Sequence, residues 1–159
     1  MGKRSTFARR PQDSYATPRE AVVPLLPHLP KMFTYVEPCA GDGDLVGHLP
    51  GKCVRSFDVE VDALSNWRTM ADLIITNPPW DRNILHPMIT HFVERADTWL
   101  LIDADWMHTR QSSDYMRLCR KVVSIGRIKW IPDSKMTGKD NCCWYLFSRG
   151  RGRTVFVGR

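Results

Sequence analysis

Two short apolar runs, with a segment of helical periodicity between them, constrain the fold of this sequence more than any other feature. Residues 71–76 and 98–103 are almost continuously apolar, which is typical of strands buried on both faces of a parallel sheet. The segment between them, residues 83–96, has apolar side chains at the spacing of one helical face: Leu85, Met88, Ile89, Phe92 and Val93. A strand, a helix and a second strand in this order predict an α/β fold with a mostly parallel central sheet and helices on both faces.

The remaining elements extend this pattern. We expect a helix, two strands, a polar helix and two further strands at residues 17–26, 33–37, 53–58, 111–121, 122–131 and 142–148. Thr17 is expected to cap the first helix, with Pro18 in its first turn. Only a loop separates the last two strands, which predicts an antiparallel hairpin at one edge of the sheet.

Composition and charge narrow the class of protein. The chain of 159 residues fits a single domain, which we place at residues 13–148, between a flexible basic arm at 1–12 and a basic tail at 149–159. A net charge of +6 favours a polyanionic partner. No apolar run is long enough to span a bilayer, and no signal peptide is evident, so we expect a cytoplasmic protein with no membrane partner. The five cysteines form no Cys-x-x-Cys pair, which indicates reduced thiols and no metal site.

A glycine-containing loop follows the expected strand at 33–37. Ligands of open α/β sheets bind beyond the carboxyl ends of the strands, and Gly41 and Gly43 let the backbone approach a cofactor closely. Asp58 follows Gly41 by 17 residues and ends the next strand, where a carboxylate can accept hydrogen bonds from ribose hydroxyls. The pattern predicts a nucleotide-like cofactor, and the alternative is a tight turn with a solvated Asp.

The tetrapeptide Asn77-Pro78-Pro79-Trp80 follows the strand at 71–76 directly. An aryl amine is a poor nucleophile because its lone pair is delocalised into the ring. The carboxamide oxygen of Asn77 and the carbonyl of Pro78 can accept its two N–H hydrogens and localise that lone pair. Proline fixes the loop and has no N–H group to compete, and Trp80 is expected to stack on a flipped-out base. The alternative is a rigid turn followed by a core tryptophan.

With these motifs the chain resembles the class I S-adenosylmethionine-dependent amino-methyltransferases, especially the DNA adenine N(6) type. Asn77–Trp80 matches their Asn/Asp/Ser-Pro-Pro-aromatic signature, and Glu37–Gly43 matches the Glu/Asp-x-x-x-Gly-x-Gly loop. Residues 13–18 resemble the Tyr-x-Thr-Pro segment that precedes this loop in many bacterial and phage enzymes. The resemblance covers roughly residues 13–105 and implies a Rossmann-like fold.

The resemblance also implies residue roles. Catalysis would fall to Asn77, Pro78, Pro79 and Trp80. S-adenosylmethionine would contact Tyr15, Thr17, Pro18, Glu37, Pro38, Cys39, Gly41, Gly43, Asp58, Val59 and Asn77. Substrate contacts are expected from Trp80, from Trp106 beside the base pocket, and from Lys135 and Lys139 in the loop 132–141.

Two departures from the family bear on cofactor and substrate. Only 13 residues separate Asp58 from Asp72, where the family often has a further strand with an adenine-contacting acid, so we expect the cofactor adenine near Trp67. The chain also has no room for a separate target-recognition domain and resembles a compact, phage-like catalytic core. Phosphate contacts should then dominate binding, with short or relaxed sequence specificity.

The leading hypothesis is methylation of adenine in DNA. RNA adenine and a protein glutamine side chain are alternative substrates for the same chemistry, since an amide nitrogen poses the same lone-pair problem. A non-catalytic nucleic-acid-binding module is the alternative from another class. The sequence leaves the oligomeric state open.

Overall fold

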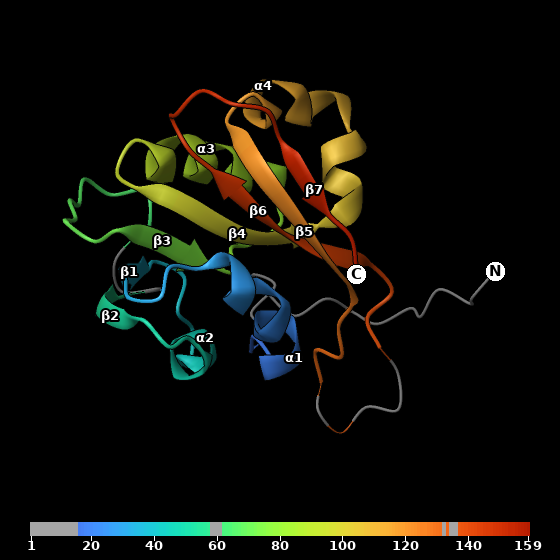
Figure 1. Ribbon diagram of the computed structural model, residues 1–159, viewed down its shortest axis with the longest axis horizontal. Helices are drawn as coiled ribbons and strands as arrows, with labels where there is room; N and C mark the ends of the chain where they lie inside the picture. The colour runs from blue at the N-terminus through green and yellow to red at the C-terminus, as the bar shows by residue number, and fades with distance from the viewer. Residues whose placement is uncertain (1–15, 58–61, 132, 134–136) are drawn as a thin grey trace.

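The structure is a computed structural model that describes residues 16–57, 62–131, 133 and 137–159. Its centre is a seven-stranded sheet with the strand order β2-β1-β3-β4-β6-β5-β7 (Figure 1). The strands are β1 (Thr34–Glu37), β2 (Lys52–Ser56), β3 (Leu73–Thr76), β4 (Asp97–Asp103), β5 (Cys119–Arg127), β6 (Asn141–Phe147) and β7 (Val155–Val157). Strand β6 runs antiparallel to both of its neighbours, and the other pairings are parallel.

Helices cover both faces of the sheet, as the sequence predicts (Figure 1). One layer holds α3 and α4, and the other holds α1 and α2. Their bounds are α1 (Arg19–Val22), α2 (Asp44–His48), α3 (Arg82–Val93) and α4 (Ser113–Met116). Short 3-10 helices extend both layers at Val23–His28, Ala104–His108 and Arg110–Ser112.

Side-chain alternation along the central strands builds a separate core on each face. In β4, Leu100 and Ile102 pack toward α3, whereas Trp99 and Leu101 pack toward α1. The five residues predicted for the inner face of α3 are all buried. Alternate residues of a strand point to opposite faces of the sheet, and helices cover both faces of β3 and β4. Both sets of residues in these strands are therefore apolar.

Tertiary pairing changes two elements from their predicted form. The polar helix expected at 111–121 ends at Met116, and Cys119 already begins β5, where it pairs with Phe147 of β6. Residues 155–157, expected as part of a basic tail, form β7 and pair in parallel with β5. The hairpin of β5 and β6 is therefore antiparallel as predicted, with β7 added outside it.

The first helix also differs from its predicted form. Pro18 occupies its N-cap, with no side-chain capping bond, so Thr17 is not the cap. The chain continues past Pro27 to His28 as a 3-10 helix, whereas the sequence predicted an α-helix ending near Leu26. Pro24 and Pro27 lack the N–H groups that an α-helix would use here.

Within the described ranges, no helix has the length and hydrophobicity required to cross a bilayer. None of the five cysteines forms a disulfide, and no three His, Cys, Asp or Glu side chains of the described residues gather as metal ligands would.

Candidate functional site

The carboxyl ends of β1 and β3 lie side by side because the two strands are parallel neighbours. Glu37, the last residue of β1, is fully buried. Its Oε1 atom accepts a hydrogen bond from the Thr76 hydroxyl and another from the Cys39 amide at 3.2 Å. The Glu37 carboxylate thus joins the glycine loop to the residue just before Asn77.

The loop after β1 turns sharply at two glycines with positive φ. Gly41 has φ 50° and Gly43, which is the N-cap of α2, has φ 86°. The Gly43 amide donates to the Ala40 carbonyl at 2.8 Å, and the Ala40 amide donates to Phe57 at 3.2 Å. A Cβ atom built on either glycine meets no atom within 4 Å. Backbone conformation therefore favours glycine here, and the space beside the loop is open to a ligand.

Asn77 lies at the carboxyl end of β3 and is half-buried. Its Nδ2 atom donates to the Oγ1 atom of the buried Thr17 at 3.2 Å. No donor among the described residues is bonded to the Asn77 Oδ1 atom. The contact orients the carboxamide and leaves its oxygen as the acceptor for an incoming N–H group.

Trp80 is held against the face of the sheet that α1 covers. Its indole N–H donates to the Leu101 carbonyl of β4 at 3.0 Å. The ring of Trp130 meets it edge to face, with centroids 6.0 Å apart and an interplanar angle of 76°. Strand β4 and the residues after β5 therefore both fix the aromatic residue of the tetrapeptide.

The other members of the motifs lie close to these residues in the chain. Pro38 and Pro78 are buried, and Pro18 and Pro79 are half-buried. Lys139 is exposed in the loop between β5 and β6. Tyr15, Asp58, Val59 and Lys135 lie outside the described residues.

Two tryptophans expected near ligands belong to the core. Trp106 is 4% exposed on the α3 face, opposite to Trp80, and its indole N–H donates to His86 Nε2 at 3.1 Å. Its ring also meets Tyr145 edge to face. Trp67 is 4% exposed as well and packs edge to face on Phe57. Both rings are therefore packed within the apolar core.

Sequence reasoning missed Thr76 and Trp130 as members of this site. A threonine that ends an otherwise apolar buried strand is a signal for Thr76, since its hydroxyl needs a partner there. No local signal marks Trp130, because its contact with Trp80 joins residues 50 positions apart.

Thirty-one chains of solved structures resemble this chain, among them the following three. A modification subunit of a putative type I restriction enzyme from Vibrio vulnificus YJ016 superposes with a TM-score of 0.52 and 14% identity, over 91% of this chain and 47% of that one. A structure of the type I R-M system gives a TM-score of 0.54 and 13% identity, over 89% and 44% of the two chains. Thermoplasma acidophilum 1320 gives a TM-score of 0.59 and 14% identity, over 81% and 83%.

This chain spans about half the length of the two restriction-modification chains it matches. Comparison with protein-family models gives no match, and comparison with curated proteins gives none either. At these identities the likeness is one of fold. It confirms the predicted Rossmann-like α/β fold, with a mostly parallel sheet and an antiparallel strand pair.

Proposed function

We propose that this chain transfers a methyl group from S-adenosylmethionine to the exocyclic amino group of adenine in a nucleic acid, with DNA as its main substrate. The hydrogen bond from Asn77 Nδ2 to Thr17 Oγ1 carries this proposal. It leaves a carboxamide oxygen as acceptor at the carboxyl end of β3, where ligands of such sheets bind.

The chemistry assigns a part to each residue of the tetrapeptide. S-adenosylmethionine, when bound, supplies an electrophilic methyl group on a sulfonium. Asn77 Oδ1 and the Pro78 carbonyl accept the two amino hydrogens and localise the nitrogen lone pair. The nitrogen would then be held to accept that methyl group, with S-adenosylhomocysteine as the leaving group and the released proton passing to solvent. Trp80 offers a ring on which the extruded base stacks.

The residues of the glycine loop fit the cofactor. The open space beside Gly41 and Gly43 suits a ligand that lies against the backbone. The buried Glu37 carboxylate supplies negative charge toward a cationic amino-acid group and ties this loop to Thr76. Thr17 and Pro18 border the same edge through the contact of Thr17 with Asn77.

Two further observations support a nucleic-acid substrate. The net charge of +6 favours a polyanion. The Vibrio vulnificus protein that shares this fold is described as a modification subunit of a putative restriction enzyme. We assign residues 13–148 to one catalytic domain and add β7 to it, because β7 pairs within the same sheet.

The test is an incubation with radiolabelled S-adenosylmethionine and, separately, double-stranded DNA, single-stranded DNA, RNA and a protein extract. The products are digested and the modified residue is identified. We expect label in N(6)-methyladenine from DNA and none with Asn77→Ala. Label in RNA adenine alone, or in glutamine, would contradict the DNA assignment. Absence of label from every substrate would point to a binding module without catalytic activity.

A further inference from the structure

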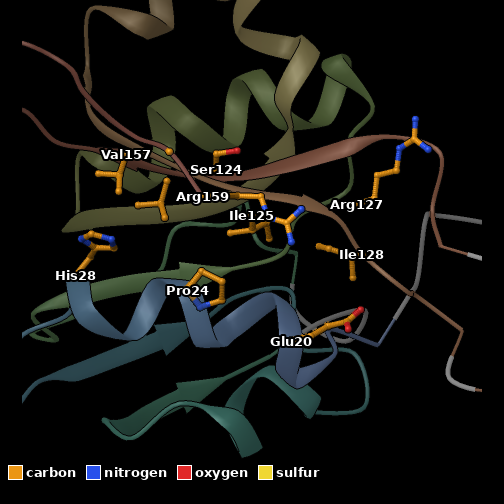
Figure 2. Close-up of a pocket in the computed structure, with 11 residues that line it drawn as sticks. Glu20, Pro24, His28, Ser124, Ile125, Arg127, Ile128, Val157 and Arg159 are labelled. Carbon is orange, nitrogen blue, oxygen red and sulfur yellow. The ribbon is translucent and has the colours of Figure 1, made fainter. Parts of the chain in front are cut away.

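A pocket lies on the α1 face of the sheet, beside the carboxyl ends of β5 and β7. It encloses about 420 Å³. Its apolar lining includes Pro24, Ile125, Ile128 and Val157 (Figure 2). This volume lies in the range typical of small-molecule sites and is large enough for a single nucleotide.

Arg159 supplies the cationic group of this pocket. In Figure 2 its side chain reaches toward Ile125, whereas the Arg127 side chain points away from it. Within the described part of the chain, the Arg159 guanidinium makes no hydrogen bond or ion pair. Its donors therefore stay available to an anion that enters the pocket.

The Arg159 side chain packs against Gly126 of β5. Gly126 has φ 77° and lies at an irregularity in the pairing of β5 with β6. A Cβ atom at this position would lie 2.6 Å from Arg159 Nη1. The guanidinium thus packs directly against the β5 backbone at this bulge, where the positive φ of residue 126 itself favours glycine.

Glu20 and His28 supply the other polar side chains of the α1 wall. Glu20 Oε1 accepts a hydrogen bond from the Lys129 amide at 2.7 Å, which ties α1 to the residues after β5. Burial, together with the nearby charge of Lys121, lowers the pKa of His28, which disfavours the charged form of this imidazole. The Glu20 carboxylate repels an anion, so we place an incoming phosphate at Arg159.

Two short segments connect this pocket to the candidate catalytic residues. Thr17, which holds Asn77, precedes Glu20 by three residues, a span of at most about 11 Å. Trp130, which packs on Trp80, follows Ile128 by two residues, a span of at most about 7 Å. The pocket thus lies on the same edge of the sheet as Asn77, and a strand bound at Asn77 could reach it within a few nucleotides.

We propose that this pocket binds one nucleotide of the substrate strand, close to the target base. Arg159 contacts its phosphate, and the apolar lining receives its sugar and base. The inference rests on the proposed function for the identity of the strand.

The test measures binding of a fluorescein-labelled single-stranded DNA oligonucleotide by fluorescence anisotropy at several salt concentrations. We expect Arg159→Gln to weaken binding about tenfold at low salt, or about 1.4 kcal/mol, because it removes a charge-assisted hydrogen bond to a phosphate. The slope of log affinity against log salt should fall by about 0.7, the value for one phosphate contact on a single strand.

Arg153→Gln is the matched control. It removes the same charge from the same segment, and Arg153 is exposed and does not line the pocket. We expect it to weaken binding less than about twofold, as a rim charge would. Equal losses in the two variants, or no loss in Arg159→Gln, would overturn the proposal.

The binding assay needs no cofactor, so it separates this proposal from the proposed function. Loss of binding in Arg159→Gln, together with a wild type that transfers no label, would refute the proposed methyl transfer and support nucleotide binding in the pocket. Transfer by the wild type with unchanged binding in Arg159→Gln would refute the pocket alone.

Discussion

The Asn77 Nδ2 atom lies 3.2 Å from Thr17 Oγ1 and donates a hydrogen bond to it. This contact joins the end of β3 to the segment that leads into α1, across 60 positions of sequence. In this arrangement the Nδ2 end of the Asn77 carboxamide is occupied within the protein. The proposed acceptor of the amino group is the other end.

Thr17 is therefore expected to act as a positioning residue for Asn77. Thr17→Val keeps the shape of the buried side chain and removes the hydroxyl. We expect kcat to fall about three- to tenfold, the value of one ordinary hydrogen bond, with the KM for S-adenosylmethionine little changed. Thr17→Ser retains the hydroxyl and should restore kcat. A raised cofactor KM with unchanged kcat would place Thr17 on the cofactor and not on Asn77.

Cysteine accessibility tests the cofactor loop without any measurement of activity. Cys39 lies in this loop and Cys53 lies on β2, and both are half-buried. We expect S-adenosylhomocysteine, at about ten times its Kd, to slow alkylation of Cys39 about tenfold and to leave Cys53 unaffected. Mass spectrometry of peptides after iodoacetamide treatment gives both rates. Equal rates at Cys39 with and without the ligand would move the cofactor away from this loop.

The three buried thiols provide an internal reference for the same experiment. Cys119, Cys142 and Cys143 are buried, and burial raises the pKa of Cys119 to about 12. They should remain unmodified in the folded protein, because the thiolate is the reactive form.

Two glycines of one short segment make a matched pair for stability. Gly43 has φ 86°, so Gly43→Ala should lower the free energy of unfolding by roughly 1–2 kcal/mol. Gly47 lies inside α2, where a Cβ atom meets nothing within 4 Å. Gly47→Ala should raise stability by about 0.5–1 kcal/mol through helix propensity. Urea denaturation measures both, and a loss in Gly47→Ala as large as that in Gly43→Ala would contradict the role of φ.

His86 should make the fold sensitive to mild acid. Burial, and then the charge of Arg82, lowers the pKa of His86 below 6.5. Its Nε2 atom accepts the Trp106 indole N–H, a contact that needs the neutral ring. The unfolded chain therefore takes up a proton near pH 6.5 before the folded chain does, and stability falls as the pH drops through this range.

His86→Gln keeps a hydrogen-bond acceptor and does not titrate. Its free energy of unfolding should improve relative to the wild type between pH 7 and pH 5, as measured by urea denaturation. His28 and His91, whose pKa values burial also lowers, are present in both proteins and cancel in the difference. A difference that does not change with pH would exclude His86 as the titrating group.

Local periodicity was sufficient for the centre of the fold. The stripe from Leu85 to Val93 and the apolar runs of β3 and β4 match the structure because both faces of these strands are covered. Cys119 and residues 155–157 were assigned wrongly because their strand state comes from pairing with β6 and β5. Such pairing joins distant segments and leaves no local pattern.

The sequence by itself determined the order of the central elements, the position of the glycine loop and the delivery of Asn77 to the end of a buried strand. Each of these follows from residues that are neighbours in the chain. The tertiary structure alone decided that Thr17 binds Asn77, that Trp130 supports Trp80, and that Trp106 and Trp67 lie in the core. The physical reason is packing, which satisfies polar groups and buries rings through contacts between residues far apart in sequence.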